Sequence, residues 1–151
     1  MLFVRIVAAA AVLVWSGCGE KTASNLEALR LRAITLPGGP AILAEVMLHP
    51  MDQARGMMFR DSLEPRRGML FIHDRPGHYT YWMYQVRIPL DILWLDSSKR
   101  IVEISANTPP CRTQASECPH YGGRERAQYV LELAGGMAEK YGLKTGQTLV
   151  F

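Results

Sequence analysis

The longest apolar run of the chain lies close to its N-terminus, from Ile6 to Trp15, directly after the charged Arg5. A run of about ten residues is too short to cross about 30 Å of hydrocarbon as a helix, but it has the length of the apolar region of a secretion signal. No second run of this kind follows. The sequence therefore predicts a signal peptide over residues 1–17 and an exported mature domain that does not span the membrane.

A cysteine follows the apolar run, in the order Ser16-Gly17-Cys18. This segment resembles the lipobox of bacterial lipoproteins, in which the cysteine is acylated and becomes the new N-terminus, although Trp15 departs from the usual aliphatic residue. We therefore predict a lipid anchor on Cys18 and a tether over residues 18–27, at the periplasmic face of a membrane. Gly19 in place of Asp favours the outer membrane, by resemblance to enterobacterial sorting rules. The alternative is ordinary signal cleavage nearby, with Cys18 incidental.

The remaining chain has the size and charge of one ordinary globular domain. Removing 17 of 151 residues leaves 134, and the net charge of +3 falls to +2 without Arg5. A chain of this length suits a single domain, which we expect over residues 28–151. No block of Lys and Arg stands out, so a nucleic-acid partner is not expected. The sequence gives no indication of the oligomeric state.

Turn signals divide the mature chain into short, β-prone segments. Pro37-Gly38-Gly39-Pro40 separates two segments that should pair as a hairpin, residues 29–36 and 41–48. Further strands are expected over residues 68–73, 79–84, 92–95, 100–105, 128–133 and 147–151. Short helices are expected from Pro50 and from Gly136, and residues 106–126 read as a long polar loop. The pattern predicts an α+β, mainly β fold: a small barrel-like antiparallel or mixed sheet with two short helices.

Two cysteines remain if Cys18 is acylated, and they are seven residues apart at Cys111 and Cys118. An even pair in an oxidising compartment favours a disulfide. A zinc site using both cysteines and His120 is an alternative, although the usual C-x₂-C spacing and a fourth ligand are missing. A redox-active pair is another, although it would prefer C-x-x-C.

Several motifs resemble the bacterial and archaeal family known as domain of unknown function number 192. They are Arg55-Gly56-Met57-Met58-Phe59-Arg60, Gly68-Met69-Leu70-Phe71, Trp82-Met83, Ile88-Pro89-Leu90-Asp91-Ile92-Leu93, Tyr129-Val130-Leu131-Glu132-Leu133, Gly135-Gly136 and Gly142-Leu143-Lys144-Thr145-Gly146. Cys111, Cys118 and Pro119 also resemble residues of the exported members. The resemblance implies a compact β-rich fold and no known activity. Where the family typically has Lys-Asn-Thr after Trp-Met, this chain has Tyr84-Gln85-Val86.

The candidate site chemistry favours a binding domain over an enzyme. Aromatic faces together with amides or carboxylates can hold a small polar ligand, which makes Trp82, Gln85 and Asp91 the candidate binding residues. A partner protein of the envelope is the other occupant expected for this surface. We expect no cofactor and no catalytic residue on this interpretation. The alternative is a hydrolase acting on an envelope carbohydrate, with Asp91 and Glu132 or a histidine as its acid–base pair. Strand alternation favours a solvent-facing Glu132 over a buried acid paired with Arg55 or Arg60.

Overall fold

The computed structural model of the chain describes residues 30–151. The predicted signal peptide, the lipid anchor on Cys18 and the tether lie outside the described residues. Within residues 30–151, none of the helices has the length and apolarity needed to cross a membrane.

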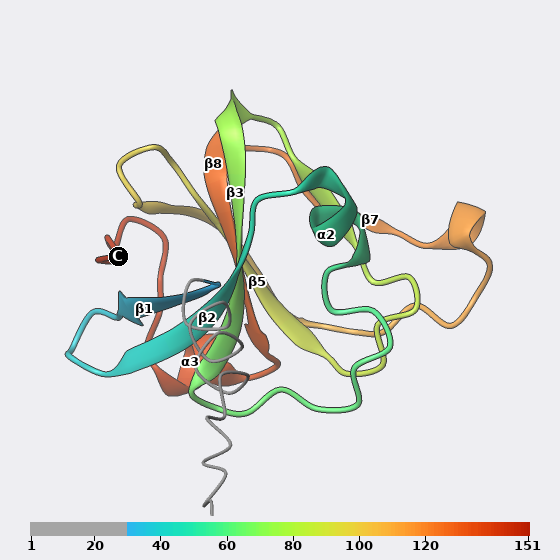
Figure 1. Cartoon of the computed structure of the whole chain (residues 1–151), viewed down its shortest axis with the longest axis horizontal. Coiled ribbons are helices and arrows are strands. Elements are labelled where there is room, and N and C mark those ends of the chain that lie inside the picture. The colour runs from blue at the N-terminus through green and yellow to red at the C-terminus, as the bar shows by residue number, and fades with distance from the viewer. Residues whose placement is uncertain (1–29) are drawn as a thin grey trace, which may run out of the picture.

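The described chain consists mainly of strands, with two short α-helices and one 3₁₀ turn (Figure 1). The strands are β1 (Leu31–Thr35), β2 (Ala41–Met47), β3 (Arg67–Gly77), β4 (Thr80–Trp82), β5 (Leu90–Leu95), β6 (Ile101–Thr108), β7 (His120–Gly122) and β8 (Ala127–Ala134). The helices are α2 (Pro50–Arg55) and α3 (Met137–Lys140), and the 3₁₀ turn is η1 (Ala115–Glu117).

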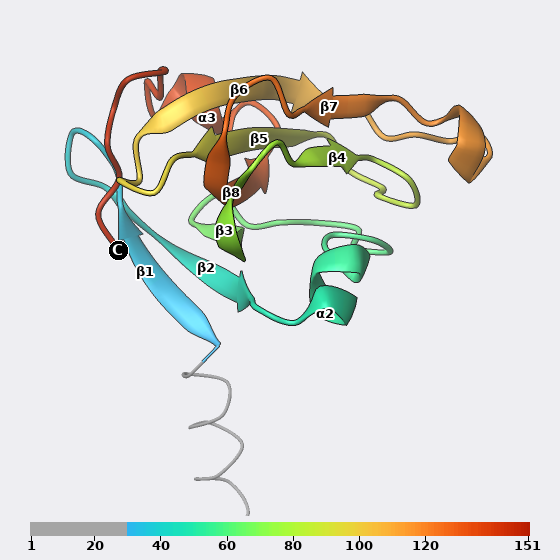
Figure 2. The same ribbon diagram turned by 90° about the horizontal axis from the view of Figure 1, so that it is seen from above.

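Six of the strands form one mixed sheet in the order β1-β2-β3-β8-β5-β6, and β4 and β7 form a separate ribbon. All pairings in the large sheet are antiparallel except β2 with β3, which run parallel. A parallel pair needs a crossover between its strands, and α2 with the segment after it supplies that connection. Figures 1 and 2 show the ribbon and η1 as an arm that projects from the body of the sheet.

Apolar clusters cover both faces of the large sheet, which explains why every residue of β5 is buried. We call them the α3 face and the α2 face. The α3 face contains Leu70, Leu93 and Leu131 and packs against Ala138 of α3. The α2 face contains Met69, Ile92 and Trp94 and extends towards the arm. Figure 2 shows α2 and α3 on opposite sides of the sheet.

The structure confirms the predicted fold class, α+β and mainly β, with a mixed sheet and two short helices. The sheet of the described chain is not closed into a barrel, because β1 and β6 form its two edges. The predicted strand over residues 147–151 is present only as isolated bridges from Thr148 to Arg100 and from Val150 to Thr35. These bridges tie the C-terminal segment to β1 and to Arg100, directly before β6, and so to both edge strands of the sheet.

Two predicted irregular segments contain more strand than the sequence indicated. β3 continues through Asp74-Arg75-Pro76-Gly77, beyond the predicted strand over residues 68–73, with an irregular register between Ile72 and Gly77. The predicted loop over residues 106–126 contains η1 and β7, and β7 pairs with β4, with Tyr121 opposite Tyr81.

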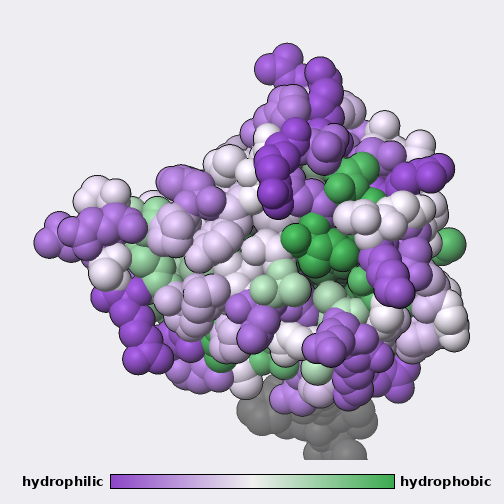
Figure 3. All heavy atoms as spheres, turned by 180° about the vertical axis from the view of Figure 1, so that it is seen from behind, coloured by the Kyte–Doolittle hydropathy of each residue, from purple (hydrophilic) through white to green (hydrophobic). Residues whose placement is uncertain are grey.

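The rear surface is mostly hydrophilic, with a small group of apolar side chains near its centre (Figure 3).

Candidate functional site

A pocket of about 340 Å³ lies where α2 and the segment after it cover the α2 face of the sheet. Pro50 occupies the first turn of α2, and Gly56 follows the helix with φ +44°, a left-handed conformation that favours glycine. The chain then turns sharply, so Met58, Phe59 and Arg60 all line the pocket. These residues belong to the Arg55–Arg60 motif, so that motif builds one wall of the pocket.

The lining of this pocket is rich in charge, and we call it the arginine pocket. Arg30, Arg55 and Arg60 line it together with Glu45 and Asp52. Arg60 donates two hydrogen bonds to the Glu45 carboxylate, at 2.6 and 2.7 Å. The hydrogen bonds from Arg60 lower the pKa of Glu45 and, reciprocally, raise the pKa of Arg60, while partial burial opposes both shifts. Within residues 30–151, Arg30 and Arg55 form no ion pair.

Glu132 lies beside this pocket, on the same face of the sheet. Glu45 is paired in register with Met69, Met69 with Glu132, and Glu132 with Ile92. Residues directly opposite each other on neighbouring strands share a face, so these four side chains form one row. Met69 lines the arginine pocket, and Glu132 is the next residue along the row.

The Glu132 side chain is buried, with 4% of its surface exposed, and no residue of the described chain gives its Oε2 atom a hydrogen bond. Burial raises the pKa of Glu132 to about 8, although the positive charge of Arg60 opposes the shift. The expectation of a solvent-facing Glu132 is therefore wrong. Alternation fails as a guide here because both faces of the sheet are covered, so neither side of β8 faces water.

A second hollow of about 320 Å³ adjoins the arginine pocket, and we call it the disulfide pocket. Phe59 lines both hollows, and its backbone N–H donates to the carbonyl oxygen of Gln85 at 3.0 Å. Gln85 has φ +57°, and it lines the disulfide pocket with Arg87, Arg112 and Cys111. The position at which the chain departs from the Lys-Asn-Thr pattern therefore lies in this second hollow.

Trp82 is the last residue of β4, in the arm. Its ring stacks on His120 at 5.9 Å between centroids and 16° between planes, and it is tilted against Tyr84 at 5.3 Å. It lines a hollow of about 220 Å³ with His73 and Tyr81, which does not include Gln85. The structure thus places the predicted binding residues Trp82 and Gln85 in separate hollows.

Asp91, the third predicted binding residue, is completely buried on the α3 face, opposite Leu133 of β8. One carboxylate oxygen accepts the backbone N–H of Asn107 at 2.6 Å, and the other accepts the N–H of Ala138 at 2.5 Å. Asp91 therefore holds α3 and the end of β6 in place. Because Glu132 pairs with Ile92, the neighbour of Asp91, the two carboxylates lie on opposite faces, an arrangement that does not fit the proposed acid–base pair.

Cys111 and Cys118 form a disulfide, as predicted. The bond uses both sulfur atoms that the alternative zinc site would need, and the third residue of that site, His120, stacks on Trp82. The residues described contain no group of three or more His, Cys, Asp or Glu side chains arranged to hold a metal ion. The disulfide closes the arm beside the disulfide pocket.

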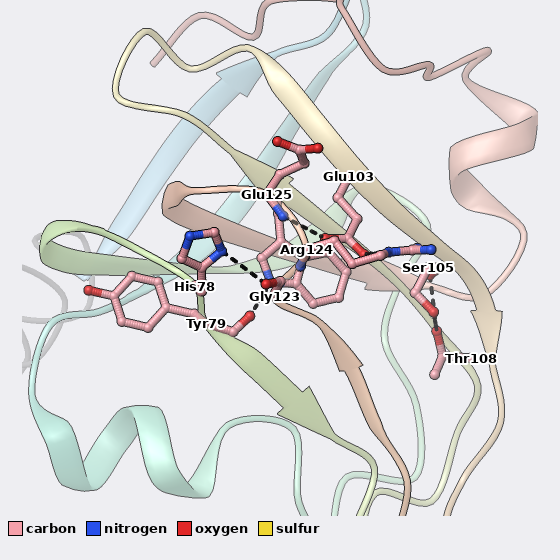
Figure 4. A network of polar contacts seen from close by, with 9 residues as sticks. His78, Tyr79, Glu103, Ser105, Thr108, Gly123, Arg124 and Glu125 are labelled. Atoms are coloured by element: carbon pink, nitrogen blue, oxygen red, sulfur yellow. Dashed lines mark hydrogen bonds and ion pairs between the residues drawn. The ribbon is translucent and has the colours of Figure 1, made fainter.

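A further polar network, centred on Glu103, holds the turn before β8 (Figure 4). The buried Glu103 carboxylate accepts the backbone N–H of Arg124 at 3.1 Å and its side-chain Nε–H at 2.7 Å. His78 contacts the carbonyl oxygen of Gly123 at 3.0 Å, which ties the connection between β3 and β4 to the same turn. Because Glu103 is fully engaged with this turn, its function is structural.

The sequence interpretation did not select the arginine pocket, although its residues were visible as the Arg55–Arg60 motif. Arg30 and Glu45, on β1 and β2, could not be joined to that motif without the strand order. The one available signal was the hypothesis that Glu132 is a buried acid near Arg55 or Arg60.

Comparisons with known proteins agree with this fold. Residues 33–151 match the model of the family DUF192, described as "Uncharacterized ACR". A comparison with curated proteins found no match.

Two crystal structures are similar to the chain. One is a protein of unknown function from Novosphingobium aromaticivorans DSM 12444, with 29% identity and a TM-score of 0.70 over 80% of this chain and 85% of that one. The other is a protein from Sinorhizobium meliloti 1021 described as a "putative transcription regulator", with 28% identity and a TM-score of 0.68 over 78% of this chain and 89% of that one. Because the family model spans most of the chain, the protein belongs to the DUF192 family.

Proposed function

We propose that this protein is an exported, lipid-anchored domain of the bacterial envelope that binds a small anionic ligand in the arginine pocket. The observation that carries the proposal is the convergence of Arg30, Arg55 and Arg60 on one pocket of about 340 Å³. Guanidinium groups bind carboxylates and phosphates through a planar fork of N–H donors. A pocket of this size is within the range of small-molecule sites.

The availability of the arginines supports an anionic ligand. Arg60 is already held by Glu45, whereas Arg30 and Arg55 are exposed and have no ion pair within residues 30–151. Met47, Met58 and Phe59 add apolar surface to the same lining, and Phe59 is 49% exposed. A ligand with an anionic group and an apolar portion would match both parts of the lining.

Binding is tested by unfolding the full chain, purified with its disulfide intact, in the presence of short carboxylates and phosphate esters. Intrinsic tryptophan fluorescence reports the transition midpoint. A ligand at about a hundred times its dissociation constant adds about 2.7 kcal/mol of stability, which raises the midpoint by several degrees. We expect Arg55→Ala to abolish the shift and the exposed Arg75→Ala, as a matched control, to leave it unchanged. Absence of any shift across the panel would contradict the proposed function.

The location is a separate part of the proposal, supported by the apolar run before Cys18 and the small residues Ser16 and Gly17. Acyl chains add about 0.8 kcal/mol for each buried CH₂ group, so a doubly or triply acylated cysteine holds a protein firmly to a membrane. We expect the wild-type chain to fractionate with membranes, with the outer membrane favoured. A Cys18→Ser variant that still partitions wholly with membranes would refute the anchor.

A further inference from the structure

Two acidic residues lie near Arg60 of the arginine pocket, but they interact with its guanidinium group unequally. They are Glu45 and Glu132, and their strand positions belong to one cross-strand row. Glu45 takes two of the guanidinium N–H groups. The positive charge of Arg60 acts to lower the pKa of Glu132, but no group of the described chain donates a hydrogen bond to its Oε2 atom.

The other groups around Glu132 do not supply the missing donor or positive charge. Its strand neighbours in register are Met69 and Ile92, both apolar and fully buried. Burial raises the pKa of Tyr81 of β4, and the nearby charges of Glu132 and Tyr79 raise it further, but the Tyr81 hydroxyl contacts His73 at 3.1 Å. An unpaired buried carboxyl oxygen is costly to keep, and such groups concentrate at functional sites.

We propose that the ligand of the arginine pocket is a zwitterion of the amino-acid type, and that Glu132 is the specificity-determining residue that accepts its ammonium group. This inference rests on the proposed function, since it adds a second recognition point to the same pocket. Arg30 and Arg55 bind the carboxylate at the mouth, and Met58 and Phe59 contact the apolar side chain. The ammonium group donates to Oε2 of Glu132, and a shift of the half-buried Arg60 side chain opens the way to it.

Ammonium recognition couples ligand binding to the ionisation of Glu132. In the free protein the raised pKa of Glu132 keeps the carboxyl largely protonated at pH 6 to 7. An ammonium group favours the carboxylate, so binding releases a proton, and affinity rises with pH until the free protein itself ionises. The slope approaches about tenfold per pH unit well below the pKa and vanishes above it.

The test compares three probes that share the leucine side chain, on the full chain by calorimetry: L-leucine, N-acetyl-L-leucine, which lacks the ammonium, and L-leucinamide, which lacks the carboxylate. We expect leucine to bind at least about tenfold more tightly than either analogue, since each charged pair contributes about 1.4 kcal/mol or more. A leucyl dipeptide distinguishes a free amino acid from a peptide N-terminus as the source of the ammonium.

Two variants assign the recognition to its residues. We expect Glu132→Gln to weaken leucine about tenfold or more, to abolish its pH dependence and to leave N-acetyl-leucine unchanged. Arg55→Ala should weaken both. Glu125→Gln, an exposed control on the same segment of chain, should change neither.

The outcomes separate this inference from the proposed function. Equal binding of leucine and N-acetyl-leucine, with no effect of Glu132→Gln, would overturn ammonium recognition and leave the anion site standing. Binding of other anions but of none of the three leucine probes would do the same. Failure of every anion and every zwitterion would overturn both proposals.

Discussion

Asp91 and Glu132 are acidic residues on neighbouring strands, buried to a similar degree, and yet their surroundings are opposite. Asp91 lies on the α3 face, and each of its oxygens accepts a backbone N–H. Glu132 lies on the α2 face beside the arginine pocket, with one oxygen unpaired within the described residues. The comparison shows that burial of a carboxyl group does not by itself mark a functional site. The number of donors that reach it separates a structural acid from a candidate for binding.

The largest effect on the free energy of unfolding is expected when the structural acid, Asp91, is removed. Asp91→Ala leaves two backbone N–H groups buried without an acceptor, at a cost of about 2 kcal/mol each. We expect the free energy of unfolding to fall by about 4 kcal/mol, measured by urea denaturation. Asp61→Ala, in an exposed ion pair with Arg87, is the control and should cost less than about 1 kcal/mol. Equal urea midpoints for Asp91→Ala and the wild type would refute the structural role of Asp91.

The second prediction concerns Glu132, whose replacement is expected to raise the free energy of unfolding at neutral pH. The folded-state pKa of about 8 lies above the usual value of 4.5, so the unfolded chain loses its proton first and stability falls as pH rises from about 4.5 to about 8. We expect Glu132→Gln, without ligand, to raise the free energy of unfolding at pH 7 by about 3 kcal/mol and to match the wild type near pH 4. A difference that is the same at both pH values would show that Glu132 is not buried with a raised pKa.

The third prediction compares the local stability of the arm with that of the α3 face. Replacing Cys111 and Cys118 by serine opens a short loop, which the chain-entropy model values at about 2 kcal/mol. Cys111 packs against the apolar cluster of the α2 face, so hydrogen exchange should quicken in β4 and β7. The amides of α3, anchored by Asp91, should keep their protection. Equal loss of protection in both regions would show that the two faces unfold together.

The smallest expected effect concerns the partly exposed pair of Arg60 and Glu45. Because the folded-state pKa of Glu45 lies below its usual value, the stability from this pair is present above about pH 4.5 and is lost as pH falls further. We expect Glu45→Gln to cost about 1 kcal/mol or less at pH 7 and less still at pH 3, after allowance for solvent screening. A larger loss at pH 3 than at pH 7, in thermal unfolding, would contradict this assignment.

Local signals in the sequence predicted most of the elements. The Pro37-Gly38-Gly39-Pro40 turn predicted the hairpin of β1 and β2, because such turns act within a few residues. The short helix predicted from Gly136 is present as α3, and Gly142 follows it with φ +62°, the left-handed conformation that commonly ends a helix. The parallel pairing of β2 with β3 had no local signal, since it depends on a crossover of 19 residues between Met47 and Arg67.

The fold does not bring the predicted binding residues together in one hollow. Trp82, Gln85 and Asp91 are close in sequence, but Trp82 and Gln85 line two separate hollows, and Asp91 lies in the core. Trp82 belongs to the β4–β7 ribbon, Gln85 to the turn that follows β4, and Asp91 to β5 of the large sheet. Sequence proximity is therefore a poor guide to a shared site in a β-rich fold.

The sequence by itself determined the family motifs and the fold class and favoured the disulfide, because each depends on composition, on turns or on a single pair of residues. Only the tertiary structure decided which carboxyl groups are structural, which faces are covered, and that Arg30, Glu45, Arg60 and Glu132 come together. The physical reason is that a buried polar group is defined by the donors that reach it, and in this sheet the groups around Glu132 come from strands and segments far apart along the chain.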